Sequence, residues 1–238
     1  IGQDMVTPVH AVRDLGIYLD SDVSMKTHVT KTVACCFATL RQIRSIRRSV
    51  TRPVLLSLVV SLVLSRLDYG CATLAGLPAC LLNRLQSVLN AAARLVHSAR
   101  KFDHVTPLLR DLHWLRVPER ISFRLSVLLY RGLHGQAPAY ISSDIHRVAD
   151  VESRRRLRSS STAALVTRPT HHKTIGDRAF PIAAARAWNS LPLSSPTLRR
   201  CPSSGADSKQ NCSRAHIASR NERSTTLLTF LYRGLDVH

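Results

Sequence analysis

The sequence predicts a mainly α protein, a helical bundle with a short β segment before it and an irregular tail after it. Apolar residues recur at helical spacing through most of residues 23–135, whereas residues 11–20 alternate in the manner of a strand. Residues 199–238 are rich in Ser and Arg and show no periodicity, so we expect that tail to be disordered. With 238 residues, 45% of them hydrophobic, the chain can bury a substantial core.

The β segment covers residues 11–20, where Leu15, Ile17 and Leu19 would share one face of a strand. A lone strand or hairpin is marginal in water. We therefore expect residues 1–22 to need a larger sheet that this sequence does not contain.

The first helix is expected over residues 28–48, with an apolar stripe formed by Val29, Val33, Cys36, Phe37, Leu40 and Ile43. Its basic residues gather toward its end, where cations also suit the negative pole of the helix dipole. They are Lys31, Arg41, Arg44, Arg47 and Arg48. The pattern is typical either of a solvated face or of a ridge that contacts phosphates.

The second helix is expected to start with Thr51 as cap and Pro53 in its first turn. Residues 53–65 carry no charge and are apolar on every side, which predicts a central buried helix. The run is shorter than the roughly 20 residues that a bilayer span requires. Arg66 and Asp68 follow it, and they must be paired or near the surface to avoid a large desolvation cost.

A break at residues 76–78 introduces the third helix, whose stripe comprises Leu81, Leu85, Val88, Ala92 and Leu95 or Val96. Residues 98–104 form a basic elbow, and Thr106-Pro107 then begin a short helix. A further helix is expected from residue 117 to about residue 133, closed by Gly135. Phe102 and Trp114 are expected to fill the gap between these helices.

Residues 136–198 are expected to combine a basic linker with a small helical region. The linker at residues 153–161 is rich in Ser and contains Arg154, Arg155 and Arg156, a composition that suits nucleic-acid contact or nuclear import. A short strand is expected at residues 163–168. A helix is expected to follow residues 176–180 and to end near residue 189.

The net charge of +19, from 34 Lys and Arg against 15 Asp and Glu, predicts a polyanionic partner. Nucleic acid is the first candidate and an anionic membrane surface the second. Aromatic residues make up only 5% of the chain, which argues against a base-stacking sheet. The candidate nucleic-acid-binding residues are Lys31, Arg41, Arg44, Arg47, Arg48, Arg94, Arg100, Lys101, His104, Arg154, Arg155 and Arg156.

No pattern in the sequence predicts catalysis or a metal site. A polymerase centre needs clustered carboxylates for two metal ions, and Asp20 and Asp22 are a weak candidate because they straddle a turn. Cys201, Cys212 and His216 lack a fourth ligand for structural zinc. The six cysteines are irregularly spaced and no secretory signal is evident, so we expect reduced thiols and an intracellular location, nuclear or cytoplasmic.

Short strings spread over residues 10–200 nevertheless resemble the C-terminal part of a LINE-type, jockey-like non-LTR retrotransposon reverse transcriptase. Each string is weak alone, and the resemblance lies in their number and order. In chain order they are VRDLG (12–16), SRLDY (65–69), AGLP (75–78), RLQ (84–86), NAAAR (90–94), RKFDHVTP (100–107), LHWL (112–115), APAY (137–140), LRSS (157–160), GDRAF (176–180) and AWNSLP (187–192).

The resemblance implies a fragment of an RNA-directed DNA polymerase from a transposable element. Residues 1–22 would end the palm, and residues 23–135 would be a helical thumb and its connection, which grips the template–primer duplex by its backbone. Residues 201–238 do not match the family. The Mg²⁺-binding aspartate pair, palm and fingers would lie upstream, so the chain alone is expected to be inactive. The implied partners are those missing domains and RNA, an RNA–DNA hybrid or DNA.

Two other functions stay open. The chain could be a basic helical module that binds nucleic acid or protein without an enzymatic role. It could also lie on a membrane surface, although the apolar stripe of residues 28–48 is narrow for an interfacial helix.

Overall fold

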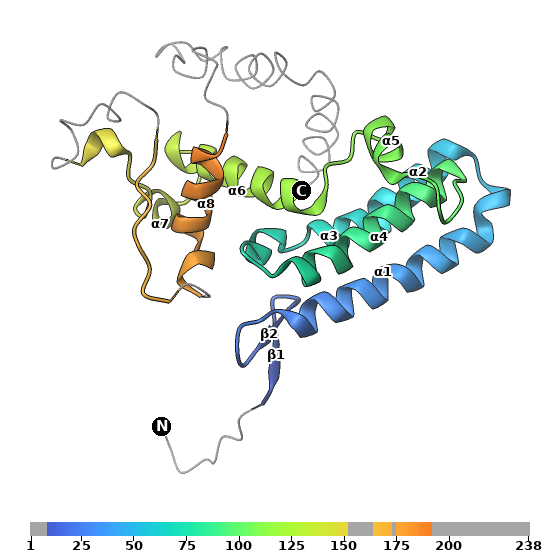
Figure 1. The fold of residues 1–238 in the computed structure, drawn as a ribbon, viewed down its shortest axis with the longest axis horizontal. Coiled ribbons are helices and arrows are strands. Elements are labelled where there is room, and N and C mark those ends of the chain that lie inside the picture. Colours follow the sequence, from blue (N-terminus) through green and yellow to red (C-terminus); the bar gives the residue numbers. More distant parts are fainter. Residues whose placement is uncertain (1–8, 152–163, 173–174, 192–238) are drawn as a thin grey trace.

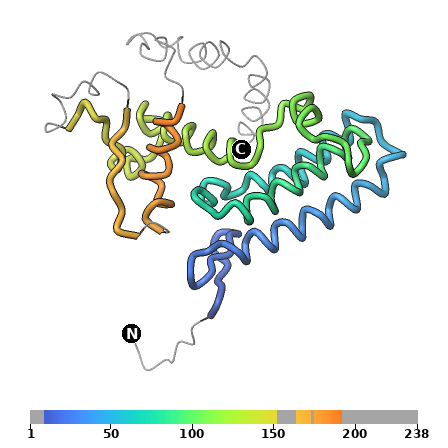
Figure 2. Tube along the Cα trace, in the orientation of Figure 1, coloured from blue at the N-terminus to red at the C-terminus, as the bar shows by residue number. Residues whose placement is uncertain are grey.

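The structure is a computed structural model that describes residues 9–151, 164–172 and 175–191. It confirms the mainly α prediction: helices dominate, and one two-stranded sheet precedes them. Figure 1 shows the helices of the first half lying lengthwise against one another, and Figure 2 shows the chain running back and forth along them before it turns away to the last helices. The predicted disordered tail, residues 199–238, lies outside the described residues.

The predicted β segment is a hairpin rather than one strand. Strands β1 (Ala11–Asp14) and β2 (Ile17–Asp20) pair antiparallel, with Asp14 opposite Ile17. The two loop residues, Leu15 and Gly16, both have positive φ, 43° and 83°, as a type I′ turn requires. Leu15 is exposed to solvent in this turn. Of the residues expected to share one apolar face, Ile17 is the one that packs on the core.

Local polar contacts fasten the hairpin to the helices. The Tyr18 amide donates to Nδ1 of the buried His28 at 3.4 Å, and the Tyr69 hydroxyl donates to the Leu15 carbonyl. Asp20 accepts hydrogen bonds from the Thr27 amide and the Ser24 hydroxyl, both at 3.1 Å. Asp20 therefore satisfies one of the free amides at the start of the next helix.

Helix α1 (Lys26–Ile46) begins two residues before the predicted start, and a 3₁₀ turn at Arg47–Ser49 extends it. Its predicted stripe is confirmed, since Val29, Cys36, Leu40 and Ile43 are buried against the other helices. Basic residues on its other faces remain exposed to solvent.

The second predicted helix forms, but it is not buried on all sides. Helix α2 (Arg52–Val59) continues through a π-helical segment (Val60–Leu64) into α3 (Ser65–Asp68). Leu55, Val59 and Val63 are buried in the core, whereas Val54 and Leu62 are exposed. The helix lies at the side of the bundle, so only one of its faces is buried although apolar residues occur on every face.

Helix α4 (Ala79–His97) packs against both α1 and α2, with the predicted stripe buried. Helices α5 (Val105–Asp111) and α6 (Val117–Leu133) follow. The Gln86 side chain accepts the Val117 amide at 2.9 Å, which ties the start of α6 to α4. Trp114, between α5 and α6, is buried as predicted.

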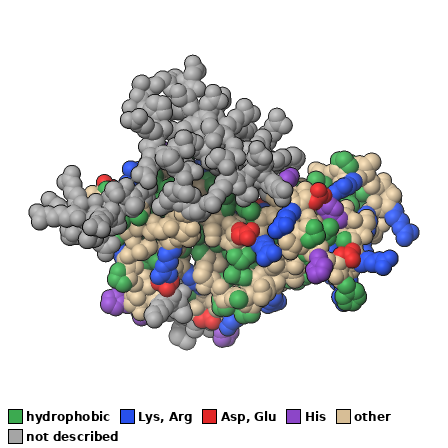
Figure 3. All heavy atoms as spheres, turned by 45° about the horizontal axis from the view of Figure 1, so that its top comes forward, with side chains coloured by type: hydrophobic (Ala, Val, Ile, Leu, Met, Phe, Trp, Pro, Cys, Tyr) green, Lys and Arg blue, Asp and Glu red, His purple; other side chains and the backbone are tan. Residues whose placement is uncertain are grey.

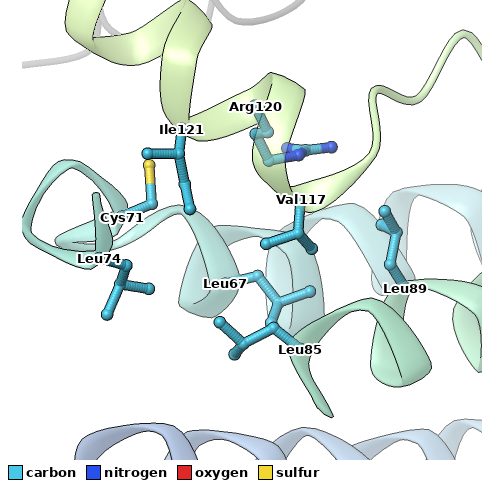
Figure 4. A pocket seen from close by; sticks show the side chains of 8 residues that line it. All are labelled: Leu67, Cys71, Leu74, Leu85, Leu89, Val117, Arg120 and Ile121. Atoms are coloured by element: carbon cyan, nitrogen blue, oxygen red, sulfur yellow. The ribbon is translucent and has the colours of Figure 1, made fainter. Parts of the chain in front are cut away.

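A buried ion pair joins α3 to α6. Arg120 donates through Nη1 to both carboxylate oxygens of Asp68 at 2.8 Å, and Arg124 lies 3.4 Å from the same carboxylate. The Arg120 and Asp68 side chains are only 9% and 8% exposed. The expected need of Asp68 for a partner is thus met, and Arg66 is exposed. Figure 4 shows Arg120 beside apolar side chains of α3, α4 and α6 that line a cavity of about 10 Å³.

The remaining described segments pack on α6. Helix α8 (Phe180–Asn189) matches the prediction and lies against α6, as does the single turn α7 (Ala139–Ser142). In place of the strand expected at residues 163–168, the described residues there form one isolated bridge, between Leu165 and Arg147. The Asn189 side chain bonds both backbone groups of Leu165 at 3.0 Å, so the end of α8 holds this segment.

The hairpin junction is expected to weaken in mild acid because of His28. Burial lowers the pKa of His28 below 6.5, with a smaller opposing effect of Asp20. The unfolded hairpin takes up the proton first as pH falls, so the junction loses stability below about pH 6.5. Hydrogen exchange of the β2 amides, corrected for intrinsic rates, should report a smaller opening free energy at pH 5.5 than at pH 7.5. The variant His28→Gln should lose this dependence, and an unchanged dependence would refute the assignment.

The cysteines of the helical region are expected to differ sharply in reactivity. Burial raises the pKa of Cys36 and of Cys71 to about 11, whereas Cys35 and Cys80 are exposed. Since the thiolate is the nucleophile, iodoacetamide at pH 8 should label Cys35 and Cys80 first. Peptide mass spectrometry should find Cys36 and Cys71 labelled only after denaturation. Equal labelling of all four in the native chain would contradict this packing.

Candidate nucleic-acid interface

Most of the predicted binding residues meet at one end of the bundle. We call residues 41–52 and 94–111 the basic end: here α1 finishes, α2 begins, α4 finishes and the elbow leads into α5 (Figure 1). These segments hold nine Lys and Arg against two Asp. Figure 3 shows Lys and Arg side chains at the right-hand end of the molecule, interspersed with His and a few acidic groups. The basic end is therefore a positively charged surface made from segments far apart in the sequence.

The last turns of α1 supply an outward ridge and one inward cation. Arg41, Arg44 and Arg48 are spaced i, i+3 and i+7, which places them on one helix face, and all three are exposed. Arg47 follows the buried Ile43 by four residues and is half-buried on the core side. In the described part of the chain no carboxylate lies within ion-pair distance of these four arginines, so their charge is available to a ligand.

The elbow has a defined conformation. Ser98 ends α4 in the left-handed region with φ 59°, and the Ala99 amide returns to the Arg94 carbonyl at 3.0 Å, closing the helix end. Asp103 then closes a turn with Arg100: the Asp103 carboxylate accepts the Arg100 amide at 2.6 Å, and the Asp103 amide donates to the Arg100 carbonyl at 3.2 Å. The turn leaves the side chains of Arg100, Lys101 and His104 exposed.

One expectation for the elbow is wrong, and one candidate residue has a further contact. Arg94 is half-buried, and its guanidinium donates to the Asp103 carbonyl at 3.2 Å, so it braces the elbow. Phe102 does not fill the gap between helices; its side chain points outward and is 89% exposed. Trp114 alone occupies the predicted packing position.

An open hollow of about 270 Å³ lies within the basic end, lined by Arg47, Arg52, His97, Ser98 and three apolar side chains. Arg52 and His97 both approach Asp111 of α5, at 3.2 Å and 3.4 Å. The Arg52 guanidinium also lies 3.3 Å from His97 Nδ1. Asp111 is the carboxylate that partly neutralises the hollow.

The surroundings of His97 favour its neutral form. Burial and the charge of Arg52 lower the pKa of His97, while Asp111 opposes the shift. A guanidinium only donates, so Nδ1 must accept from Arg52 and the proton must reside on Nε2. An anion entering the hollow would be repelled by the Asp111 carboxylate and would compete with it for the Arg52 guanidinium.

Lys31 lies apart from the other predicted residues that the structure describes. Lys31 stands near the opposite end of α1, about 20 Å from Arg44 at 1.5 Å per residue, and its ammonium lies 4.0 Å from the centroid of the Tyr18 ring. It belongs to the hairpin junction. Arg154, Arg155 and Arg156 lie outside the described residues.

Three members of the basic end were not predicted from the sequence as binding residues, namely Arg52, His97 and Arg110. Arg52 reaches His97 and Asp111 across 45 and 59 residues of sequence, a separation that no local pattern detects. A signal did exist for Arg110, which is an exposed cation in the last turn of the short predicted helix.

Nothing among the described residues groups three or more His, Cys, Asp or Glu side chains around a common metal position. Asp20 and Asp22, the weak metal candidates, instead accept hydrogen bonds from Ser24 and Thr27. The described helices include none with the length and hydropathy of a bilayer span. Comparison of the chain with protein-family models, curated proteins and solved structures gave no match.

Proposed function

We propose that this chain binds nucleic acid through its phosphate backbone, and that it is the thumb-like fragment of a non-LTR retrotransposon reverse transcriptase. The observation that supports binding is the basic end. It contains nine Lys and Arg but only two Asp, and its segments belong to or adjoin four helices. The ancestry is supported by the ordered strings of the sequence. In this proposal the metal-dependent chemistry belongs to a palm domain outside the chain.

Backbone recognition fits the side chains that are exposed. Arginine presents a planar fork that matches phosphate oxygens, and six of the nine cations of the basic end are exposed arginines. The Arg41, Arg44 and Arg48 ridge lies along a helix, so it can follow successive phosphates. Phosphate contacts fix position and carry no direct sequence information, so we expect little sequence preference.

The proposal is tested by the salt dependence of binding. The purified chain is titrated with a fluorescent RNA–DNA hybrid at several KCl concentrations between 50 and 200 mM. If six phosphates are neutralised, the plot of log K against log salt should have a slope of roughly −5 on a duplex. A flat plot, or no binding at 50 mM, would refute the proposal.

The alternative is a basic helical module that binds a protein. It is favoured by the hairpin, where Val9, Val12, Leu15 and Leu19 expose apolar side chains at the opposite end of α1 from the basic end. The two functions use different surfaces, so a salt-insensitive protein complex that survives neutralisation of the basic end would support this alternative.

A further inference from the structure

Phe102 is the most exposed large hydrophobic side chain that the structure describes. A solitary apolar residue on a surface needs no explanation, but Phe102 stands in the elbow of the basic end, flanked by exposed Arg100, Lys101 and His104. The Lys101 ammonium lies 5.8 Å from the centroid of the phenyl ring. An aromatic face is thus presented among cations at the surface proposed to hold phosphates.

The elbow holds Phe102 in a fixed place. Phe102 is the third residue of the turn that Arg100 and Asp103 close through two hydrogen bonds, of 2.6 Å and 3.2 Å. Arg94 braces that turn from α4 at 3.2 Å. Fixing the backbone in advance reduces the entropy that a contact by this ring would lose.

The same contacts make a role for Phe102 in core packing untenable. Its ring is absent from the hydrophobic core and from the partly buried residues around it. Asp103, the only acidic residue of the elbow, has its carboxylate engaged by the Arg100 amide. The elbow therefore exposes an aromatic ring beside three basic side chains, the combination by which proteins bind unpaired nucleotides.

We propose that Phe102 stacks on an unpaired base next to the duplex that the basic end holds, so that the chain prefers a duplex with a single-stranded extension to a blunt duplex. The inference rests on the proposed function and adds the class of substrate. Bases inside a duplex have both faces covered by their neighbours, whereas an unpaired base offers a free face to an aromatic ring. Stacking of this kind tolerates any base.

The test compares two ligands and two variants. The ligands are a blunt RNA–DNA hybrid and the same hybrid with a single-stranded extension of ten nucleotides. Phe102→Ala should weaken binding of the extended ligand about 5- to 150-fold, leave the blunt ligand unchanged and keep the salt slope. Tyr140→Ala is the matched control, because Tyr140 is 72% exposed on α7 at the other side of the molecule (Figure 1).

Two further variants separate stacking from plain apolar contact. Phe102→Leu should lose most of the preference for the extended ligand. Phe102→Trp should retain it, and the added fluorescence relative to wild type should be quenched when the extended ligand binds. Wild-type affinity of Phe102→Ala or Phe102→Leu for the extended ligand, or equal losses on both ligands, would overturn the inference.

The outcomes also distinguish this inference from the proposed function. If the wild-type salt slope is steep but Phe102→Ala has no effect, the stacking inference is refuted and backbone binding still stands. A flat wild-type salt response on both ligands would overturn backbone binding and the stacking inference together.

Discussion

Asp68→Asn is expected to lower the free energy of unfolding by about 3–5 kcal/mol, the usual cost of leaving one member of a buried ion pair without its partner. The Asp68 carboxylate is the anion that Arg120 meets at 2.8 Å and Arg124 at 3.4 Å. Arg120 lies among the apolar side chains drawn in Figure 4, and its Nε and Nη2 have no other hydrogen-bond partner within the described residues. Neutralising Asp68 would leave the Arg120 guanidinium without a counter-ion in a region with little solvent.

Urea denaturation followed by circular dichroism measures the effect. The control is Asp22→Asn, which removes an exposed carboxylate 3.9 Å from Lys26 and should leave the midpoint unchanged. The double variant Asp68→Leu/Arg120→Met should recover much of the loss, because apolar pairs of similar volume often replace buried ion pairs without cost. If Asp68→Asn unfolds at the wild-type midpoint, α6 does not depend on this contact.

Neutralising the end of α1 is expected to produce the largest loss of binding. The triple variant Arg44→Gln/Arg47→Gln/Arg48→Gln removes three cations that are free of carboxylate partners in the described structure. If each contacts one phosphate of the RNA–DNA hybrid, the slope of log K against log salt becomes about 2.7 less steep. Between 50 and 200 mM salt the wild-type affinity should then fall about 40-fold more than that of the variant.

The matched control removes the same charge from the other end of α1. Arg13, Lys26 and Lys31 are exposed near the hairpin, and their triple replacement by Gln should change the slope little. Both triple variants have the same net charge, so overall attraction cannot account for a difference between them. Equal slopes in the two variants would mean that charge acts through the whole molecule rather than through the basic end.

The helices could be predicted from the sequence because their stripes are complete. Leu81, Leu85 and Val88 recur at helical spacing, and α4 buries all three. The hairpin turn could not, because Leu15 occupies a positive-φ position that the type I′ turn normally gives to Asn or Gly. Hydropathy also overstated the burial of α2, since a uniformly apolar helix does not reveal which side meets solvent.

The charge of the basic end could be predicted from the sequence, but its geometry could not. Arg100 and Arg94 look equivalent in the sequence, yet Arg100 is exposed, whereas Arg94 is half-buried and donates to the Asp103 carbonyl. The direction of Phe102 depends on the same turn. The triangle of Arg52, His97 and Asp111 arises only when α2, α4 and α5 meet.

The length of α1 sets a scale for whatever lies along it. Its 21 residues correspond to about 32 Å of helix axis, with the hairpin at one extremity and the arginines at the other. A double helix laid parallel to this rod would advance about nine base pairs over that length, at 3.4 Å per step. In the proposed binding mode, an enzyme centre joined to the hairpin would therefore act on a position roughly one helical turn away from the phosphates that the arginines contact.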